Sequence, residues 1–420
     1  MKLELRALIS PRDDLFRRLE FLIRSLRILP GSVKEDQGDP LAEKVYLGLR
    51  LLSQVFGFKV PGMDIDAEQH AKASRDVKAL QTPDERLQRL SFALFGQTND
   101  TILYRGLVPE KPDLAAISAD VIRLSSLSDQ SLMSHANDIF SLKKIDLMST
   151  FSSDRYAWIK VNHGWWEQVT GYAFETSGVN PAGVSRAAHY YESTSSQDIM
   201  FRSLQLIATP TNTAGSFDFI NSEMAFAISF NGGNLWNDEV TSPLPPHIRG
   251  AMLGAAPFFR AATGGERFNV ADGAAAKKLA YANKLGDFCA LVRARSDLAL
   301  FIVPDHLKTI GVVDFEGDES HIIVPSSTIH ELWPVTLAYV AGEVAKVLLR
   351  YKRVTVFVQA AAISFPISVL IMHLARNLAA NVHLYDLGQV LDLAEPEGHR
   401  TKTWARDAYP QGHDCGFTLR

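Results

Sequence analysis

The sequence predicts an α/β fold: a Rossmann-like, mostly parallel sheet with flanking helices, preceded by an N-terminal helical region. Short runs of β-branched and other apolar residues at 298–304, 321–325 and 354–358 are typical of buried parallel strands. Helical patterns alternate with these strands, as at 336–351, and this alternation favours a parallel sheet. The chain of 420 residues is 46% hydrophobic and 21% charged, so it can bury a sizeable core in two to three domains.

Three regions are expected along the chain. Residues 1–148 have mostly helical patterns of apolar residues, broken by prolines. Near position 150 the pattern changes to strands alternating with helices, and we assign 149–395 to the Rossmann-like α/β domain. The polar C-terminal segment 396–420 contains glycine and proline and is expected to be irregular.

Residues 354–386 form the most informative stretch of the sequence. VTVFV predicts a short buried strand, and the small residues of 359–364 predict a turn. Pro366 suits the first turn of the helix that follows, where its missing N–H costs nothing. The segment VHLYD at 382–386 predicts a second strand. This is the size of one β-turn-α-β unit.

The turn of this unit is a candidate phosphate site. Small side chains allow backbone N–H groups to approach a ligand, and a helix N-terminus favours phosphate. Ala361 and Ser364 are therefore substrate-binding candidates. No GxGxxG, GxxxxGK[ST], GxSxG or HExxH motif accompanies the turn. The uncharged run 354–375 is also long enough to span a bilayer, which is an alternative interpretation of the same residues.

Polar residues gather where a predicted strand, YAWIKV, ends and a helix begins. At such strand ends α/β sheets bind their ligands. His163 and Glu167 are the candidate catalytic residues, since both can accept a proton near neutral pH when tuned by their surroundings. Lys160, Asn162 and Trp166 are candidates for binding the substrate. The alternative is a helix cap and turn in which the tryptophan belongs to the core.

Two further groups are candidates. Asn221 and Glu223 could supply oxygen ligands to one hard cation, Mg²⁺ or Mn²⁺, although a helix cap explains them equally well. The stretch 249–295 carries an excess of basic residues, and arginine can hold a diphosphate bidentately. Arg260 and Arg267 are the substrate-binding candidates there, against the alternative of a solvated helix face.

Charge and cysteine content exclude some classes of protein. The net charge of −4, from 43 basic and 47 acidic residues, gives no reason to expect a nucleic-acid partner. Two cysteines cannot form a disulfide framework or a cysteine-based zinc motif. The charged N-terminus has no signal-peptide core, so we expect a cytoplasmic location.

The C-terminal half resembles the GT-D-type glycosyltransferases, which are bacterial enzymes with a Rossmann-like fold. The similarity covers about residues 150–395 and rests on the unit VTVFVQAAAISFPISVLIMHLA followed by LYDLG, which ends at Asp386 and Gly388. The resemblance implies a nucleotide-sugar donor, a glycan or lipid-linked acceptor, and substrate binding by Asp386. In that family an Asp-x-Glu turn binds metal and nucleotide sugar, whereas here His163 stands where the aspartate would be.

Three functional hypotheses follow. The first is a transferase that moves a sugar from a nucleotide sugar to a glycan or lipid-linked acceptor. The second is a non-catalytic nucleotide- or sugar-binding or assembly protein, which the altered Asp-x-Glu pattern favours. The third is another Rossmann-like transferase or hydrolase, since a fold does not determine a function. The sequence leaves a homo-oligomer open.

Overall fold

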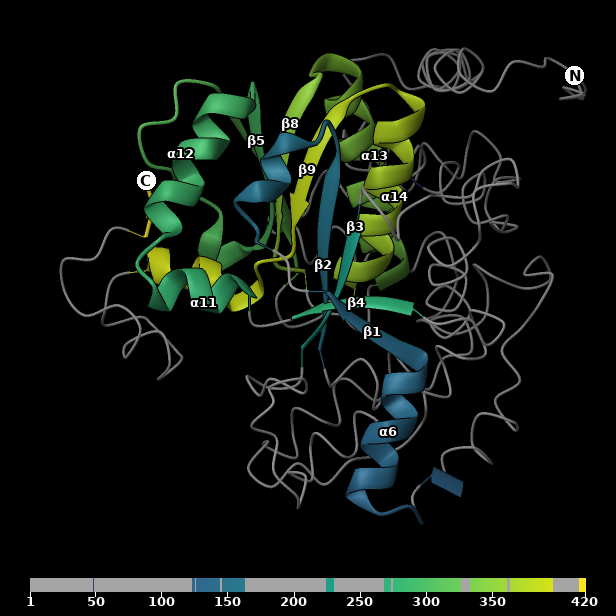
Figure 1. Ribbon diagram of the computed structural model, residues 1–420. Coiled ribbons are helices and arrows are strands. Elements are labelled where there is room, and N and C mark those ends of the chain that lie inside the picture. Colours follow the sequence, from purple (N-terminus) through teal and green to yellow (C-terminus); the bar gives the residue numbers. More distant parts are fainter. Residues whose placement is uncertain are drawn as a thin grey trace, which may run out of the picture.

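The protein is built around a parallel eight-stranded sheet that lies between two layers of helices (Figure 1). Every neighbouring pair of strands in this sheet is parallel, which confirms the predicted α/β fold. The computed structural model describes Gly48 and residues 123–124, 126–143, 146–162, 224–229, 268–272, 275–325, 333–360, 363–395 and 415–420.

The strand order of the sheet is β1-β4-β3-β2-β9-β8-β5-β7. Strands that are neighbours in the sheet therefore come from distant parts of the chain, and β2 and β9 meet at its centre. The strands are β1 (Phe140–Lys143), β2 (Tyr156–Asn162), β3 (Met224–Ser229), β4 (Phe268–Asp272), β5 (Leu298–Pro304), β7 (Asp318–Val324), β8 (Arg353–Val358) and β9 (Asn381–Tyr385).

Helices cover both faces of the sheet. Helices α13 (Trp333–Arg350) and α14 (Ser364–Asn377) pack against each other on one face, where α14 contacts β2 and β9 (Figure 1). The opposite face carries α11 (Ala275–Tyr281) and α12 (Leu285–Arg295) (Figure 1). On that side the core includes aromatic residues from α12 and the strands, namely Trp158, Phe288, Phe301, Phe357 and Tyr385.

The burial of the central strands explains their composition. All seven residues of β5 are buried, as are the five residues of β8 that follow Arg353. A strand covered on both faces needs apolar side chains on both, so it reads as a continuous apolar run. In the β-turn-α-β unit, Pro366 lies in the first turn of α14 as expected. The run 354–375 thus covers most of β8 and most of α14.

The helix expected over 274–295 is two helices. Asn283 has φ of 53°, a left-handed conformation that asparagine tolerates better than most residues. The Lys284 N–H donates to the carbonyl of Leu279 at 2.9 Å, which closes α11 in the manner of a helix C-terminus. Apolar residues recur at helical spacing on both sides of this turn, so the sequence pattern alone did not reveal the break between α11 and α12.

Strands also occur in regions where none was expected. Helix α6 (Asp129–Ile139) leads directly into β1, which lies within the region 1–148 and nevertheless pairs with β4. The segment 396–420, expected to be irregular, contains β10 (Phe417–Leu419). Both strands are only three or four residues long, too short to show a period-two pattern.

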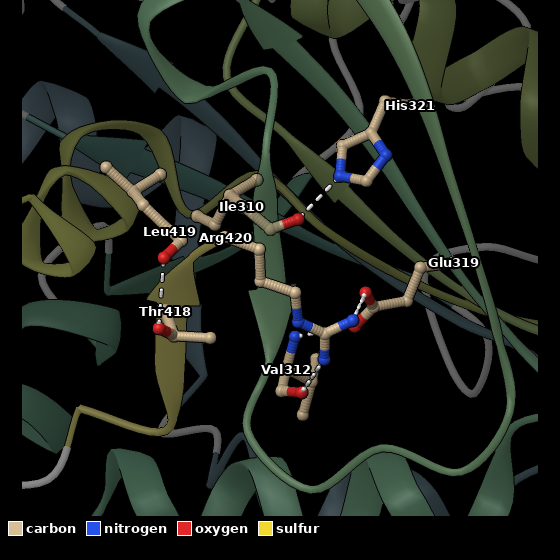
Figure 2. A network of polar contacts seen from close by, with 7 residues as sticks. All are labelled: Ile310, Val312, Glu319, His321, Thr418, Leu419 and Arg420. Atoms are coloured by element: carbon tan, nitrogen blue, oxygen red, sulfur yellow. Dashed lines mark hydrogen bonds and ion pairs between the residues drawn. The ribbon is translucent and has the colours of Figure 1, made fainter.

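A two-stranded antiparallel sheet, β6 (Ile310–Val312) with β10, ties the C-terminus to the domain. Figure 2 shows the polar contacts that surround it. The Glu319 carboxylate accepts hydrogen bonds from the Val312 N–H at 2.8 Å and from Arg420 Nη1 at 2.6 Å. A Cβ atom at Gly311 would lie 2.8 Å from the same carboxylate, so a larger residue here would displace the Glu319 side chain from this position.

None of the helices among the described residues combines the length and the apolar character needed to cross a membrane.

Glu319 is expected to contribute more to stability than an exposed ion pair does. Its side chain is only 10% exposed, and replacing it with alanine leaves the Val312 N–H without an acceptor. We expect Glu319→Ala to lower the free energy of unfolding by about 1–3 kcal/mol in urea titrations. Asp297→Ala is the matched control, because the Asp297–Arg353 pair is about half exposed and water screens such a pair, so its loss should change stability little. Equal losses in both variants would contradict this role of Glu319.

Candidate functional site

The carboxyl ends of all eight strands lie at one edge of the sheet, because every strand runs in the same direction. In α/β proteins ligands bind outside this edge. Two groups of polar side chains occur there in the described residues. One lies at the ends of the central strands β2 and β9, and the other follows β5 and β8.

Asp386 directly follows β9 and is only 5% exposed. Its backbone N–H donates to the carbonyl of Trp158 at 2.9 Å, which continues the pairing of β9 with β2. The carboxylate accepts hydrogen bonds from the backbone N–H groups of Lys160 and Gly388. Burial raises the pKa of Asp386 to about 7, against the opposing effects of Lys160 and of these two N–H groups. Asp386 can therefore gain or lose a proton near neutral pH.

Lys160 is the nearest cation to this carboxyl group. Tyr156, Trp158 and Lys160 alternate along β2, so they share one face of the strand. Burial lowers the pKa of Lys160, while the charge of Asp386 acts in the opposite direction. No ion pair within 4 Å joins the Lys160 ammonium to an acidic group of the described residues. A partly buried cation without such a partner is suited to hold an anionic ligand.

Gly388 lies between the two charged groups. Its φ of 51° is left-handed, a conformation that glycine adopts without strain. A Cβ atom at this position would lie 3.9 Å from Lys160 Nζ and 3.8 Å from Asp386 Oδ1. A side chain here would therefore occupy the space beside both groups, and glycine leaves that space open.

The predicted phosphate turn is partly described. The Ser364 hydroxyl accepts a hydrogen bond from the Ala360 N–H at 3.1 Å, and Ser364 is buried. The serine oxygen is thus engaged in shaping the turn at the start of α14. Ala361, the other candidate in this turn, lies outside the described residues.

The second polar group joins three segments at the same edge. His306 belongs to the short helix η3 (Asp305–Leu307) after β5, and Gln359 follows β8. Asp392 lies in the 3-10 helix η5 (Gly388–Ala394) after β9, and Glu395 follows that helix. The Gln359 Nε2 donates to Asp392 Oδ1 at 2.9 Å, and His306 Nε2 lies 3.5 Å from the same oxygen.

The structure brings together some of the residues predicted from sequence. Lys160 and Asp386 meet at the centre of the sheet edge, and Ser364 lies at the start of α14. Asn162 is the last residue of β2. The remaining candidates lie outside the described residues: His163, Trp166, Glu167, Asn221, Glu223, Arg260, Arg267 and Ala361.

The sequence analysis missed His306, Gln359, Asp392 and Glu395. His306 and Gln359 follow predicted strands within two residues, so the rule that singled out Lys160 would have found them. No comparable pattern marks Asp392 and Glu395, which reach the edge through the conformation of η5. The described residues contain no group of three His, Cys, Asp or Glu residues arranged to hold a metal ion.

The raised pKa of Asp386 predicts how pH affects stability. The pKa of an aspartate in the unfolded chain is about 4, so between pH 4 and 7 the folded protein keeps a proton that the unfolded chain has lost. This group therefore makes the protein less stable as pH rises through that window. We expect wild type to lose about 2–3 kcal/mol relative to Asp386→Asn between pH 5 and 8, measured by urea unfolding. The exposed Asp154→Asn is the control, and an equal pH dependence in all three proteins would refute the prediction.

Two solved structures resemble part of the chain at low sequence identity. No protein-family model and no curated protein sequence matches the chain. A selenomethionine-substituted structure of domain of unknown function 1792 is 12% identical, with a TM-score of 0.38, and the match covers 62% of this chain and 82% of that one. A second structure, described as a highly conserved domain of unknown function 1792 with a distinct glycosyltransferase fold, is 11% identical, with a TM-score of 0.36 and the same coverage. At these values the likeness carries no argument about the function of this chain.

Proposed function

We propose that the protein is a glycosyltransferase that transfers a sugar from a nucleotide-sugar donor to a glycan or lipid-linked acceptor. The observation that carries this proposal is the pair of Lys160 and Asp386 on the two central strands. One supplies a cation without an ion-pair partner among the described acidic groups, and the other a carboxyl group with a pKa of about 7. The Lys160 ammonium would bind the diphosphate of the donor, and the Asp386 carboxyl group would bind a hydroxyl of the sugar.

The reaction requires charge to be stabilised at the donor. The acceptor hydroxyl oxygen attacks the anomeric carbon, and the bond from that carbon to the diphosphate oxygen breaks. The leaving nucleoside diphosphate takes the electron pair, and Lys160 stabilises its growing negative charge. A base takes the proton of the acceptor hydroxyl. His163 and Glu167, which follow β2 in the sequence, are proposed for that role, and Asp386 for holding a hydroxyl of the substrate.

Other parts of the predicted site belong to the same proposal. Asn162 and Trp166 would contact the substrate, and Arg260 and Arg267 would add positive charge for the diphosphate. Mg²⁺ or Mn²⁺, with Asn221 and Glu223 as ligands, would neutralise part of that charge. Activity that survives removal of divalent ions by a chelator would exclude the metal and leave the roles of Lys160 and Asp386 intact.

A nucleotide- or sugar-binding protein without turnover is the second candidate. The segment after β2 reads HGWWE and has no Asp-x-Glu pair, which favours binding over catalysis. Ligand binding raises the apparent stability of the native state in both cases. Only release of nucleoside diphosphate separates the two functions.

We expect Lys160→Met to weaken nucleotide-sugar binding and turnover by roughly ten- to a hundred-fold, as the loss of a charged hydrogen bond does. The measurement is nucleoside diphosphate release from a panel of nucleotide sugars, with calorimetric titration of the best donor. Asp386→Asn should lower turnover as well, because a neutral carboxamide holds a substrate hydroxyl less strongly than a carboxylate does.

The control for this experiment is Lys346→Met, which removes an exposed lysine from α13. It changes the net charge by the same amount and should leave binding unchanged. Binding that is equally weak in both lysine variants would indicate a general effect of charge and contradict a site at Lys160.

A further inference from the structure

The second polar group links η5 to the ends of the neighbouring strands. His306 Nε2 lies 3.5 Å from Asp392 Oδ1 and 3.7 Å from Glu395 Oε1. Gln359 holds the same Asp392 oxygen through its Nε2 at 2.9 Å. The His306 imidazole, which follows β5, and the Gln359 carboxamide, which follows β8, therefore both contact the C-terminal part of η5.

The charge of the His306 imidazole affects the stability of this contact because the two carboxylates that face it are buried. The Asp392 and Glu395 side chains are only 8% and 9% exposed, while His306 is 46% exposed. Two buried carboxylates near each other repel strongly unless a cation lies close to both. His306 is the one cationic side chain within ion-pair distance of Asp392 in the described part of the chain. Its protonated form thus holds η5, and its neutral form does so far less.

The geometry argues against a proton-transfer role for this imidazole. Nε2, the ring nitrogen that projects farthest from the backbone, is already directed at Asp392 and Glu395. A general base that is oriented by a carboxylate needs its other ring nitrogen free at the reacting group. Here the other nitrogen is Nδ1, which lies beside the residue's own backbone. His306 therefore holds a structural element in place and does not act on a substrate.

The opposite end of η5 lies beside Lys160 and Asp386 of the candidate site. The helix begins at Gly388, whose N–H donates to Asp386 and whose position lies beside Lys160. Between the two ends, Val390, Leu391 and Leu393 are buried in the core. A displacement of the C-terminal part of this seven-residue helix is therefore expected to move Gly388 as well.

We infer that His306 is a positioning residue: its imidazolium clamps η5 through Asp392 and Glu395, and thereby keeps Asp386 and Gly388 in place beside Lys160. The clamp is a property of the folded chain. Its consequence for ligand affinity rests on the proposed function. The site is held at acid pH and loosens as the imidazole loses its proton.

The direction of the pH effect follows from the surroundings of the ring. The hydrogen bond to Asp392 raises the pKa of His306, with further contributions from the charges of Asp392, Glu395 and Asp305, and burial opposes them. Lys308 is paired with Asp305 at 3.6 Å. A raised pKa in the clamped state means that the clamp is complete below the ordinary histidine value, about 6.5, and is lost as pH rises through the raised value.

Hydrogen exchange tests the clamp without any ligand. The amides of Val390 and Glu395 donate to the carbonyls of Leu387 and Asp392 within η5. After correction for intrinsic rates, we expect their protection in wild type to fall by about three- to ten-fold between pH 5.5 and 8.5, because the clamp weakens as His306 loses its proton. His306→Gln should abolish this fall. The Tyr351 amide at the end of α13 is the internal control and should show no such change.

A second variant keeps the inference falsifiable if His306→Gln does not fold. Asp392→Asn retains an oxygen for Gln359 and removes the charge, so the pKa of His306 followed by NMR should drop toward its ordinary value. An unchanged pKa in that variant, or equal pH dependence of exchange in wild type and His306→Gln, would overturn the clamp.

Pyrophosphate titration connects the clamp to the candidate site. Affinity should fall more steeply with pH in wild type than in His306→Gln, and the dependence that remains in the variant comes from Asp386, Lys160 and the pyrophosphate itself. Equal pH dependence in the two proteins would overturn the link between clamp and site. If pyrophosphate does not bind wild type at any pH, the proposed function fails, while the exchange experiment still decides the clamp.

Discussion

The pairing of β2 with β9 is the interaction on which the rest of the structure depends. It joins the strands β1, β4, β3 and β2 to the strands β9, β8, β5 and β7, so a single sheet exists only because of it. Its register places Trp158 opposite Tyr385, and just beyond the last paired residues the backbone N–H of Lys160 donates to the Asp386 carboxylate. A shift by one residue would turn Lys160 to the opposite face of the sheet and separate the two charged groups.

Aromatic packing beneath the pair maintains this register. Trp158 and Tyr385 are fully buried side by side on the same face of the sheet. The ring of Phe288 packs edge-on against Tyr385 with ring centroids 4.9 Å apart, and the Thr150 and Tyr385 hydroxyl oxygens are 2.6 Å apart. Large side chains with fixed orientations tolerate little movement of the strands. The polar edge therefore rests on a rigid base.

The burial that stabilises the sheet also determines the chemistry of its edge. Removal from water disfavours the charged form of Asp386 and of Lys160, whereas the half-exposed His306 gains its proton more readily because two carboxylates face it. The helix η5 connects these groups, since it begins beside Asp386 and carries Asp392 near its end. One short segment of backbone thus joins a titratable imidazole at one end to the pair of Lys160 and Asp386 at the other.

The sequence by itself determined the local elements and part of the site. Apolar runs identified β5 and β8, Pro366 marked the start of α14, and the rule that strand ends carry ligands singled out Lys160. Only the tertiary structure decided which strands are neighbours, because pairing depends on side-chain packing between residues as distant as Thr150 and Tyr385, which are 235 positions apart. The group formed by His306, Gln359, Asp392 and Glu395 was not predicted either, because it also depends on which strands are neighbours. His306 and Gln359 follow predicted strands, but no pattern marks Asp392 and Glu395, and the four residues meet only where three strand ends converge.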